Sequence, residues 1–447
     1  MTRTKDMTVG SPFRLILVFC LPIIAGNLLQ QLYSLIDTLV IGRVEGVTAL
    51  AAVSSAGWLD WTVLSIAMGL AQGFAIQIAQ SFGASNVSEL RRAEGQSILL
   101  SVVAVVVLEL LSQVLLAPIL RLMNTPGATF ALTELYLRII FSGLPLVMAY
   151  NLLSGFLRSV GDSRTPLISV VSATVLNIVL DVLFVAVFHW SVVGVAAATT
   201  IAQGISALIC LIAILRLPIM HLSRADLTFD RHMSGHLMKL GMPVAFQNGI
   251  ISVGGLVLQS VVNSFGFIFM AGYSAASRLQ GLIEIAGSSL SSAVGTFAGQ
   301  NLGAGKIDRV KRGLRLSVWL GIGMALFVAA IMIIFGQQLL ALFVEDDPAI
   351  VDQVLAIGYR FLCVMSAGLF TLYLLFVYRS TLQGIGDTVI PMISGFVELA
   401  MRVGSALLLP RLLGEWGIYL AEIMAWVGAA LLLMWGYYYR IGKYVNR

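Results

Sequence analysis

The sequence carries little charge for its length. Only 11% of its 447 residues are Asp, Glu, Lys or Arg, whereas 59% are hydrophobic. Soluble domains carry about 25% charged residues, so this composition excludes a soluble protein and indicates a polytopic membrane protein. The formal charge of +5 requires no nucleic-acid partner, because basic residues in the loops that orient membrane helices account for it.

Cysteine and histidine are scarce as well. The three cysteines lie in apolar segments without the spacing of a metal site or a disulfide framework, and the four histidines lie in or beside predicted loops. The sequence also lacks the paired histidines of zinc proteases, the phosphate-binding loop of ATPases and the nucleophile elbow of hydrolases. We therefore predict no enzyme and no cofactor. Any transport would draw its energy from an ion gradient.

Long apolar spans dominate what remains. Spans of about 20 apolar residues can cross a bilayer as helices, and twelve are present, so we predict an all-α membrane protein. The polar N-terminus is short and the first span is too long for the core of a signal peptide, so we expect the first helix to be retained. The predicted spans are 13–42, 48–82, 90–117, 130–156, 165–188, 192–217, 237–265, 269–299, 311–338, 350–380, 389–410 and 416–439.

Basic residues are distributed unevenly between the predicted loops. If the N-terminus lies inside, 20 of the 27 Lys and Arg residues fall on the inner side and five on the outer side. Positive charge is retained on the cytoplasmic side of membranes. We therefore expect both termini to be cytoplasmic.

The two halves of the chain resemble each other. Three matches have nearly equal offsets of 220, 225 and 221 residues, which indicates a duplication. Six helices per repeat give both halves the same orientation, related by an axis along the membrane normal. The matched segments are 80–92 with 300–312, 161–166 with 386–391, and Pro22 with Pro243.

This duplication predicts two parallel six-helix lobes around a central cavity. We place the N-terminal lobe at 1–220, a cytoplasmic linker at 221–236 and the C-terminal lobe at 237–447. Such lobes are typical of an alternating-access transporter. A channel would need a filter-like loop, which the sequence does not show.

Two aspartates lie well inside predicted spans, Asp37 in the first and Asp181 in the fifth. Tyr33 and Asn177 each precede one of them by four residues, a spacing that places each pair on one helix face. Acids in lipid are costly and usually functional. Both aspartates and Thr199 of the sixth span fall in the outer half of the membrane. Their oxygen atoms suit a proton or a sodium ion.

The second half lacks these acids. Leu258 stands at the position of Asp37, and Ala406 at that of Asp181. A purely structural requirement of the repeat should appear in both halves, so we assign the pair a functional role. Hydrogen bonds between helices remain the alternative role for the neighbouring amide and hydroxyl groups.

Further polar residues lie in other spans. Glu398 and Arg402 are four residues apart, which predicts an ion pair within one helix. Glu284 is a candidate for attracting a cation, whereas Glu422 lies near an outer end and should be wetted. Pro22 is either a static bend or a hinge coupled to Asp37.

Together these features resemble the multidrug and toxic compound extrusion (MATE) family over essentially the whole chain. The resemblance implies sodium- or proton-driven export of organic, often cationic, compounds. It places an ion site on Asp37, Asn177, Asp181 and Thr199. The features are the twelve spans in two repeats, Pro22, LYSLIDTLVIG with Tyr33 and Asp37, QSFGA repeated as QNLGA, GDSRTP repeated as GDTVIP, and Asn177 with Asp181.

The sequence departs from some members of that family. The region 242–255 holds Gln247 but no carboxylate, so an acid in the seventh helix is not matched. For the cavity that binds the compound we name Tyr33, Asn151, Gln247 and Glu284. We expect a small organic substrate, membrane lipid as the only other partner, a monomer and the inner membrane of a prokaryote.

Two other classes of function compete. A flippase of lipid-linked precursors, or of polysaccharide, from the same superfamily would need a cationic cavity and usually additional helices. A membrane-embedded enzyme or a channel would need a catalytic set or a filter. The acidic first lobe favours the exporter.

Overall fold

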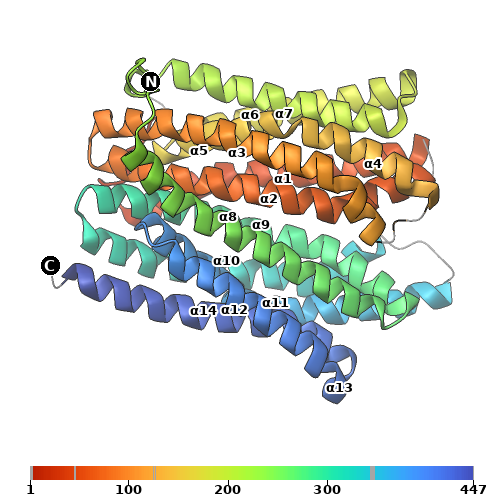
Figure 1. Cartoon of the computed structure of the whole chain (residues 1–447). Coiled ribbons are helices and arrows are strands. Elements are labelled where there is room, and N and C mark those ends of the chain that lie inside the picture. Colours follow the sequence, from red (N-terminus) through yellow and green to blue (C-terminus); the bar gives the residue numbers. More distant parts are fainter. Residues whose placement is uncertain (1–3, 45–46, 124, 126, 343–347, 446–447) are drawn as a thin grey trace. The chain divides into compact units, whose positions relative to one another are not determined.

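The computed structural model describes the backbone of residues 4–44, 47–123, 125, 127–342 and 348–445. Side chains are described for these residues except 33–40, 42–44, 47, 48, 50, 51, 54, 55, 128, 348, 349 and 443–445. All regular elements in this described part are helices (Figure 1). The prediction of an all-α protein is therefore confirmed.

The first half of the chain forms helices that match the first six predicted spans within a few residues. Their bounds are α1 Pro12–Val44, α2 Val47–Gly83, α3 Val87–Leu122, α4 Gly127–Ser142, α5 Leu144–Ser159, α6 Arg164–Asp181, the π-helix η1 Val182–Val187, α7 Ser191–Leu215 and the short η2 Pro218–Met220.

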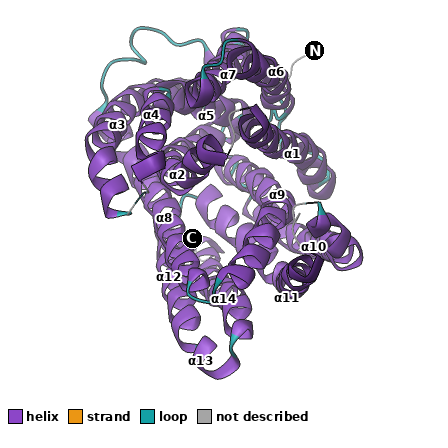
Figure 2. Cartoon of the chain, turned by 90° about the vertical axis from the view of Figure 1, so that its right-hand side faces the viewer, coloured by secondary structure: helices purple, strands orange, loops and turns teal. Residues whose placement is uncertain are grey.

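The second half repeats this pattern. The bounds are α8 Arg231–Asn263, α9 Phe267–Gly303, α10 Ile307–Ala341, α11 Pro348–Gly384, α12 Val389–Leu408, α13 Pro410–Leu413 and α14 Glu415–Val445. Within this half α12 and α14 lie side by side, and the four residues of α13 join them at one end (Figure 2).

Apolarity alone identifies most of the membrane helices. Ten helices of the described part are long and apolar enough to cross a membrane, and the bent pair α4 and α5 makes an eleventh span. The remaining predicted span, 269–299, is α9, which has 37 residues but carries Arg278, Glu284 and many small polar residues. The lower apolarity of α9 indicates that protein neighbours, rather than lipid, cover its polar face.

One predicted span is wrong in detail. The sequence predicts a single helix over 130–156, but α4 and α5 meet at Gly143 with a bend of 45°. Pro145 lies in the first turn of α5, where proline is tolerated because that N–H has no partner within the helix. A Cβ atom on Gly143 would lie 2.8 Å from Cγ2 of Thr200, so the bend brings this glycine directly against α7.

Packing divides the chain into two compact units. Unit 1 comprises Met1–Met7 and Leu21–Gly249, and unit 2 comprises Thr8–Cys20 and Ile250–Arg447. Both divisions fall inside a helix, in α1 directly before Pro22 and in α8 shortly after Pro243. The lobe boundaries around 221–236 stay a prediction.

One buried side-chain amide in unit 1 anchors the polar connection before α8 through hydrogen bonds. Gln96 on α3 donates to the backbone oxygen atoms of Asp226 and Thr228 at 3.2 and 2.7 Å. Its oxygen accepts from the backbone N–H of Asp230 at 3.0 Å and from the hydroxyl of Ser234 at 2.9 Å. Hydrogen bonds from Ser223 hold the pKa of the Asp226 carboxyl below its usual range.

Unit 2 contains a buried network of charges. Glu398 on α12 binds Arg379 of α11 at 2.8 Å and Arg402 of its own helix at 2.9 Å. Arg402 also binds Glu422 of α14 at 3.0 Å. Two arginines and two glutamates thus pair three helices inside the unit. Buried charges are tolerated when they are paired in this way.

Candidate functional site

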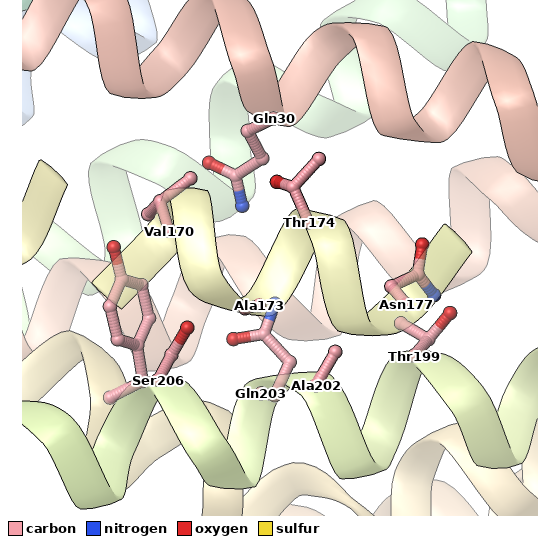
Figure 3. Close-up of a pocket in the computed structure, with 10 residues that line it drawn as sticks. Gln30, Val170, Ala173, Thr174, Asn177, Thr199, Ala202, Gln203 and Ser206 are labelled. Carbon is pink, nitrogen blue, oxygen red and sulfur yellow. The ribbon is translucent and has the colours of Figure 1, made fainter. Parts of the chain in front are cut away.

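A small polar cavity lies inside unit 1, between α1, α5, α6 and α7. Figure 3 shows Gln30 of α1 pointing toward α6, near Val170 and Thr174. The cavity leaves about 20 Å³ for the centre of a water-sized sphere, and one water needs roughly 10–15 Å³ by the same measure. Its lining residues are Gln30, Tyr150, Val170, Ala173, Thr174, Asn177, Thr199, Ala202, Gln203 and Ser206.

Two polar side chains of this cavity have no hydrogen-bond partner among the described residues. Asn177 is only 1% exposed, and neither atom of its amide group is bonded; the hydroxyl of the buried Thr174 is likewise unbonded. Buried polar groups almost always have a partner, so such groups mark a place for water or an ion. The cavity therefore has both the room and the unsatisfied groups for a small polar occupant.

Asp181 lies one helical turn from Asn177, at the last residue of α6. Its side chain is completely buried and takes part in an interaction. Directly after it the chain forms the π-helix η1 over Val182–Val187. Short π-helical turns inside α-helices frequently occur at functional sites, because they re-aim the side chains around them. Sequence reasoning found the aspartate but not this change of helix type.

The structure brings together part of the predicted ion site. Asn177 and Thr199 line the same cavity from α6 and α7 (Figure 3). Asp181 follows on the same helix. Tyr33 and Asp37 belong to α1, but their side chains lie outside the described residues, so their predicted roles stay predictions.

The other predicted cavity residues do not line this cavity. The amide of Asn151 donates to the backbone oxygen of Val147 at 2.9 Å. Gln247 is buried in the part of α8 that belongs to unit 1. Glu284 belongs to unit 2 and accepts a hydrogen bond of 2.9 Å from Gln280. A role for these residues in binding a compound stays a prediction.

Sequence reasoning missed several lining residues, namely Gln30, Tyr150, Thr174, Gln203 and Ser206. A sequence pattern that could have indicated them exists on α7, where the polar residues at positions 199, 203 and 206 have the spacing of one helix face. It was also present on α1, where Gln30 precedes Asp37 by seven residues. Polar residues at such spacing are too common in membrane helices to identify a cavity without knowing which faces meet.

For the acids of unit 2 the outcome is mixed. The predicted ion pair of Glu398 with Arg402 is confirmed at 2.9 Å. The prediction that Glu422 is wetted is wrong, because its side chain is buried and binds Arg402. Counting residues from the helix end gave the depth of Glu422 but not the direction of its face.

The comparisons with known proteins agree with one another. The MatE family model matches residues 22–183 and again 243–406, and so covers both repeats. The chain is 29% identical over 458 residues to the probable multidrug resistance protein YoeA of Bacillus subtilis (strain 168), covering 98% of this chain and 96% of that protein. It is 26% identical over 432 residues to the multidrug export protein MepA of Staphylococcus aureus (strain N315), covering 94% and 93%.

Solved structures show the same fold. An outward-facing multidrug resistance MATE family transporter of the MOP superfamily aligns with a TM-score of 0.92 at 22% identity, over 100% of this chain and 99% of that chain. Two matches of one family model, starting at Pro22 and Pro243, also agree with the duplication that the sequence predicts. The chain belongs to the MatE family of multidrug and toxic compound extrusion transporters, which are twelve-helix membrane proteins and not enzymes.

Proposed function

We propose that this transporter is a secondary antiporter that exports organic, often cationic, compounds and is driven by a proton or sodium gradient. The observation that supports it most directly is the cavity in unit 1, where the amide of Asn177 is buried without a partner among the described residues. A permanently unsatisfied amide costs about 1–3 kcal/mol. Such a cost is expected at a site that is filled during the working cycle.

The ion site consists of Asp37, Asn177, Asp181 and Thr199. Two carboxylates, an amide oxygen and a hydroxyl are hard oxygen ligands, which suit a proton or a sodium ion. Neutralising the two carboxylates removes the charge that makes this part of the membrane helices costly. Loading of the site from outside then favours the conformation that releases the compound outward.

Pro22 is the proposed hinge of α1. The helix packs with unit 2 up to Cys20 and with unit 1 from Leu21 onward. Proline removes one hydrogen bond of a helix and permits a bend. A bend at this point changes the position of the segment that carries Tyr33 and Asp37. Tyr33, Asn151, Gln247 and Glu284 are proposed to contact the transported compound.

The protein operates as a monomer in the inner membrane of a prokaryote, with both termini in the cytoplasm. The flippase alternative requires a cationic cavity. The ion site proposed for the first lobe is acidic, and the additional helices usual in such flippases are not predicted, so the exporter is favoured.

Purified protein in proteoliposomes tests the proposal. Ethidium transport is measured under an imposed pH gradient and, separately, under an imposed sodium gradient. We expect one gradient to drive transport and Asp37→Asn to abolish it. Asp308→Asn, which alters an almost fully exposed carboxylate, serves as the control and should transport normally. Full gradient-driven transport by Asp37→Asn would show that the proposed coupling site is wrong.

A further inference from the structure

An apolar groove of about 370 Å³ lies on unit 2, between the start of α1 and α10. Pockets of roughly 300–1,000 Å³ hold small ligands, so the groove is large enough for part of a molecule with an apolar body. The described residues that line it carry no charge. They are Phe13, Trp319, Leu320, Gly323, Met324 and Phe327.

Gly323 forms the open centre of this groove. Trp319 and Phe327 lie one helical turn before and after it, on the same face of α10, and they are 68% and 67% exposed. A Cβ atom on Gly323 would meet no atom within 4 Å. Two large aromatic side chains thus flank a position that has no side chain, which leaves a notch wide enough for an apolar chain.

The groove lies in the part of α10 that crosses the inner half of the membrane. The 35 residues of α10 span about 52 Å at a rise of 1.5 Å per residue, whereas the hydrocarbon core is about 30 Å thick. A centred helix therefore enters the hydrocarbon near Leu314, and the groove extends from Trp319 to about the middle of the bilayer. The distribution of basic residues places the start of α10 on the cytoplasmic side.

Basic residues are concentrated directly before the groove. The ten residues 306–315 include five Lys or Arg and one acid, and this acid pairs with Lys311 at 3.3 Å. Arg312 and Arg315, which we call the arginine pair, precede Trp319 by seven and four residues and so lie on its face of the helix. Both are exposed. Within the described part of the chain, neither forms a hydrogen bond or an ion pair.

The other two basic residues hold the walls of the groove together. Nζ of Lys306 donates to the backbone oxygen of Thr8 at 2.9 Å, and the guanidinium of Arg309 donates to that of Gly10 at 3.0 Å. These bonds fix the start of α1 against the start of α10 within unit 2. The structural roles of Lys306 and Arg309 leave the arginine pair as the charge that faces the groove.

We propose that the groove binds one anionic phospholipid of the inner leaflet, with an acyl chain beside Gly323 and the phosphate at the arginine pair. Basic pockets between membrane helices on the cytoplasmic side bind anionic head groups, and arginine binds a phosphate through two parallel N–H groups. Trp319 lies between the two parts of the lipid, and tryptophan is favoured at the level of the head groups. The lipid bridges Phe13 and α10 and so steadies the segment of α1 before Pro22.

Two other occupants fit the groove less well. The arginine pair repels a cationic compound. A second copy of the chain in a symmetric dimer would present the same surface from both sides, which brings two arginine pairs toward each other. An anionic lipid satisfies both the apolar groove and the charge at its end.

Native mass spectrometry of the purified full-length protein tests the proposal by measuring the affinity for the first bound lipid. The probes are dioleoylphosphatidylglycerol and dioleoylphosphatidylcholine, which share their acyl chains and differ in head-group charge. One Lys or Arg near an anionic lipid contributes about fivefold in affinity. We expect phosphatidylglycerol to bind at least about tenfold more tightly than phosphatidylcholine, and the double variant Arg312→Gln with Arg315→Gln to lose most of this preference.

Arg121→Gln with Arg411→Gln is the matched control for charge. Both arginines are exposed, lie near predicted outer ends and form no ion pair or hydrogen bond with a described residue. This variant carries the same net charge as the groove variant. It should keep the preference for phosphatidylglycerol, whereas loss of the preference here as well would show general charge attraction and overturn the site.

Gly323→Leu tests the groove itself. Its side chain fills the notch, its Cβ atom meets no atom within 4 Å, and leucine favours a helix more than glycine does, so the variant should fold. We expect it to lose the preference for phosphatidylglycerol. Gly57→Leu on α2 is the control, because Gly57 is also exposed and its Cβ atom would likewise meet no atom within 4 Å. This control should bind lipid as the wild type does.

Several results would overturn the site. Equal affinity of the wild type for the two lipids is one, and an undiminished preference in Gly323→Leu or in the arginine variant is another. Displacement of phosphatidylglycerol by ethidium would assign the groove to a cationic compound, and a dimer without bound lipid would assign it to a second copy. None of these results depends on the coupling ion, because all residues of the site belong to unit 2.

Discussion

At the scale of single residues, Asn177 is the most informative side chain of this protein. Its amide is buried on α6 in a cavity where no described residue bonds to it. Residues selected for stability alone would not include such a group, because an apolar side chain of the same size avoids the desolvation cost. Function and stability therefore make opposite demands at this position, and a substitution can separate them.

Replacing Asn177 with Leu should abolish gradient-driven transport and leave the protein as stable as the wild type or more stable. The expected gain is at most about 1–3 kcal/mol, the cost of one unsatisfied buried group. Transport in proteoliposomes and thermal unfolding in detergent measure the two effects. A marked loss of stability would contradict the prediction.

Asn301→Leu provides the matched comparison. This buried asparagine donates to the backbone oxygen of Phe297 at 2.8 Å and accepts from Arg309 at 2.9 Å. Its replacement should lower the stability, because it removes two buried hydrogen bonds, one of them to the charged Arg309.

At the scale of helices, unit 2 is held by charges rather than by apolar contacts alone. Glu398 binds two arginines on two helices, and Arg402 in turn reaches α14 through Glu422. Gly254 of α8 makes room for this group, since a Cβ atom there would lie 2.8 Å from the guanidinium of Arg402. The network thus sets which faces of α8, α11, α12 and α14 meet.

Glu398→Leu should destabilise the protein by about 3–5 kcal/mol, because it leaves Arg379 buried without its carboxylate partner. Thermal unfolding in detergent measures the effect. The comparison is Asp308→Ala, which removes an exposed pair with Lys311 and should cost about 0–1 kcal/mol. Equal stability of the two variants would show that the network contributes little.

The bend between α4 and α5 depends on Gly143. Gly143→Ala should destabilise the protein by about 1–3 kcal/mol through overpacking, since its Cβ atom would lie 2.8 and 2.9 Å from Cγ2 and Oγ1 of Thr200. Thr200→Ala removes both atoms and should restore most of the loss in the double variant. Thermal unfolding of the wild type, the two single variants and the double variant gives the coupling energy between the two substitutions. Simple additivity of the two changes would rule out this contact as the reason for glycine.

At the scale of the whole molecule, orientation rests on the distribution of charge. We expect a membrane-impermeant maleimide to label Leu412→Cys in intact cells, and Ser223→Cys only after lysis, in a variant without Cys20, Cys210 and Cys363. Both positions are exposed. The reverse pattern would mean that the excess of basic residues does not set the topology.

Most of the architecture could be predicted from the sequence. Twelve apolar spans, the duplication around Pro22 and Pro243, and the pair of Asn177 and Asp181 follow from hydropathy, spacing and the cost of charge in lipid. These properties are local, since each depends on a residue and its neighbours along the chain. The sequence also predicts the span 269–299, which is α9, although this helix is less apolar than the others.

The tertiary structure alone decided which faces meet. Hydropathy places both Glu422 and Glu284 inside apolar spans, yet Glu422 belongs to an ion-paired network and Glu284 is held by Gln280. The cavity around Asn177 and the bend at Gly143 likewise depend on contacts between helices that are separated in sequence. Hydropathy determines that a helix crosses the membrane, but the rotation of each helix about its axis is set by packing against its neighbours.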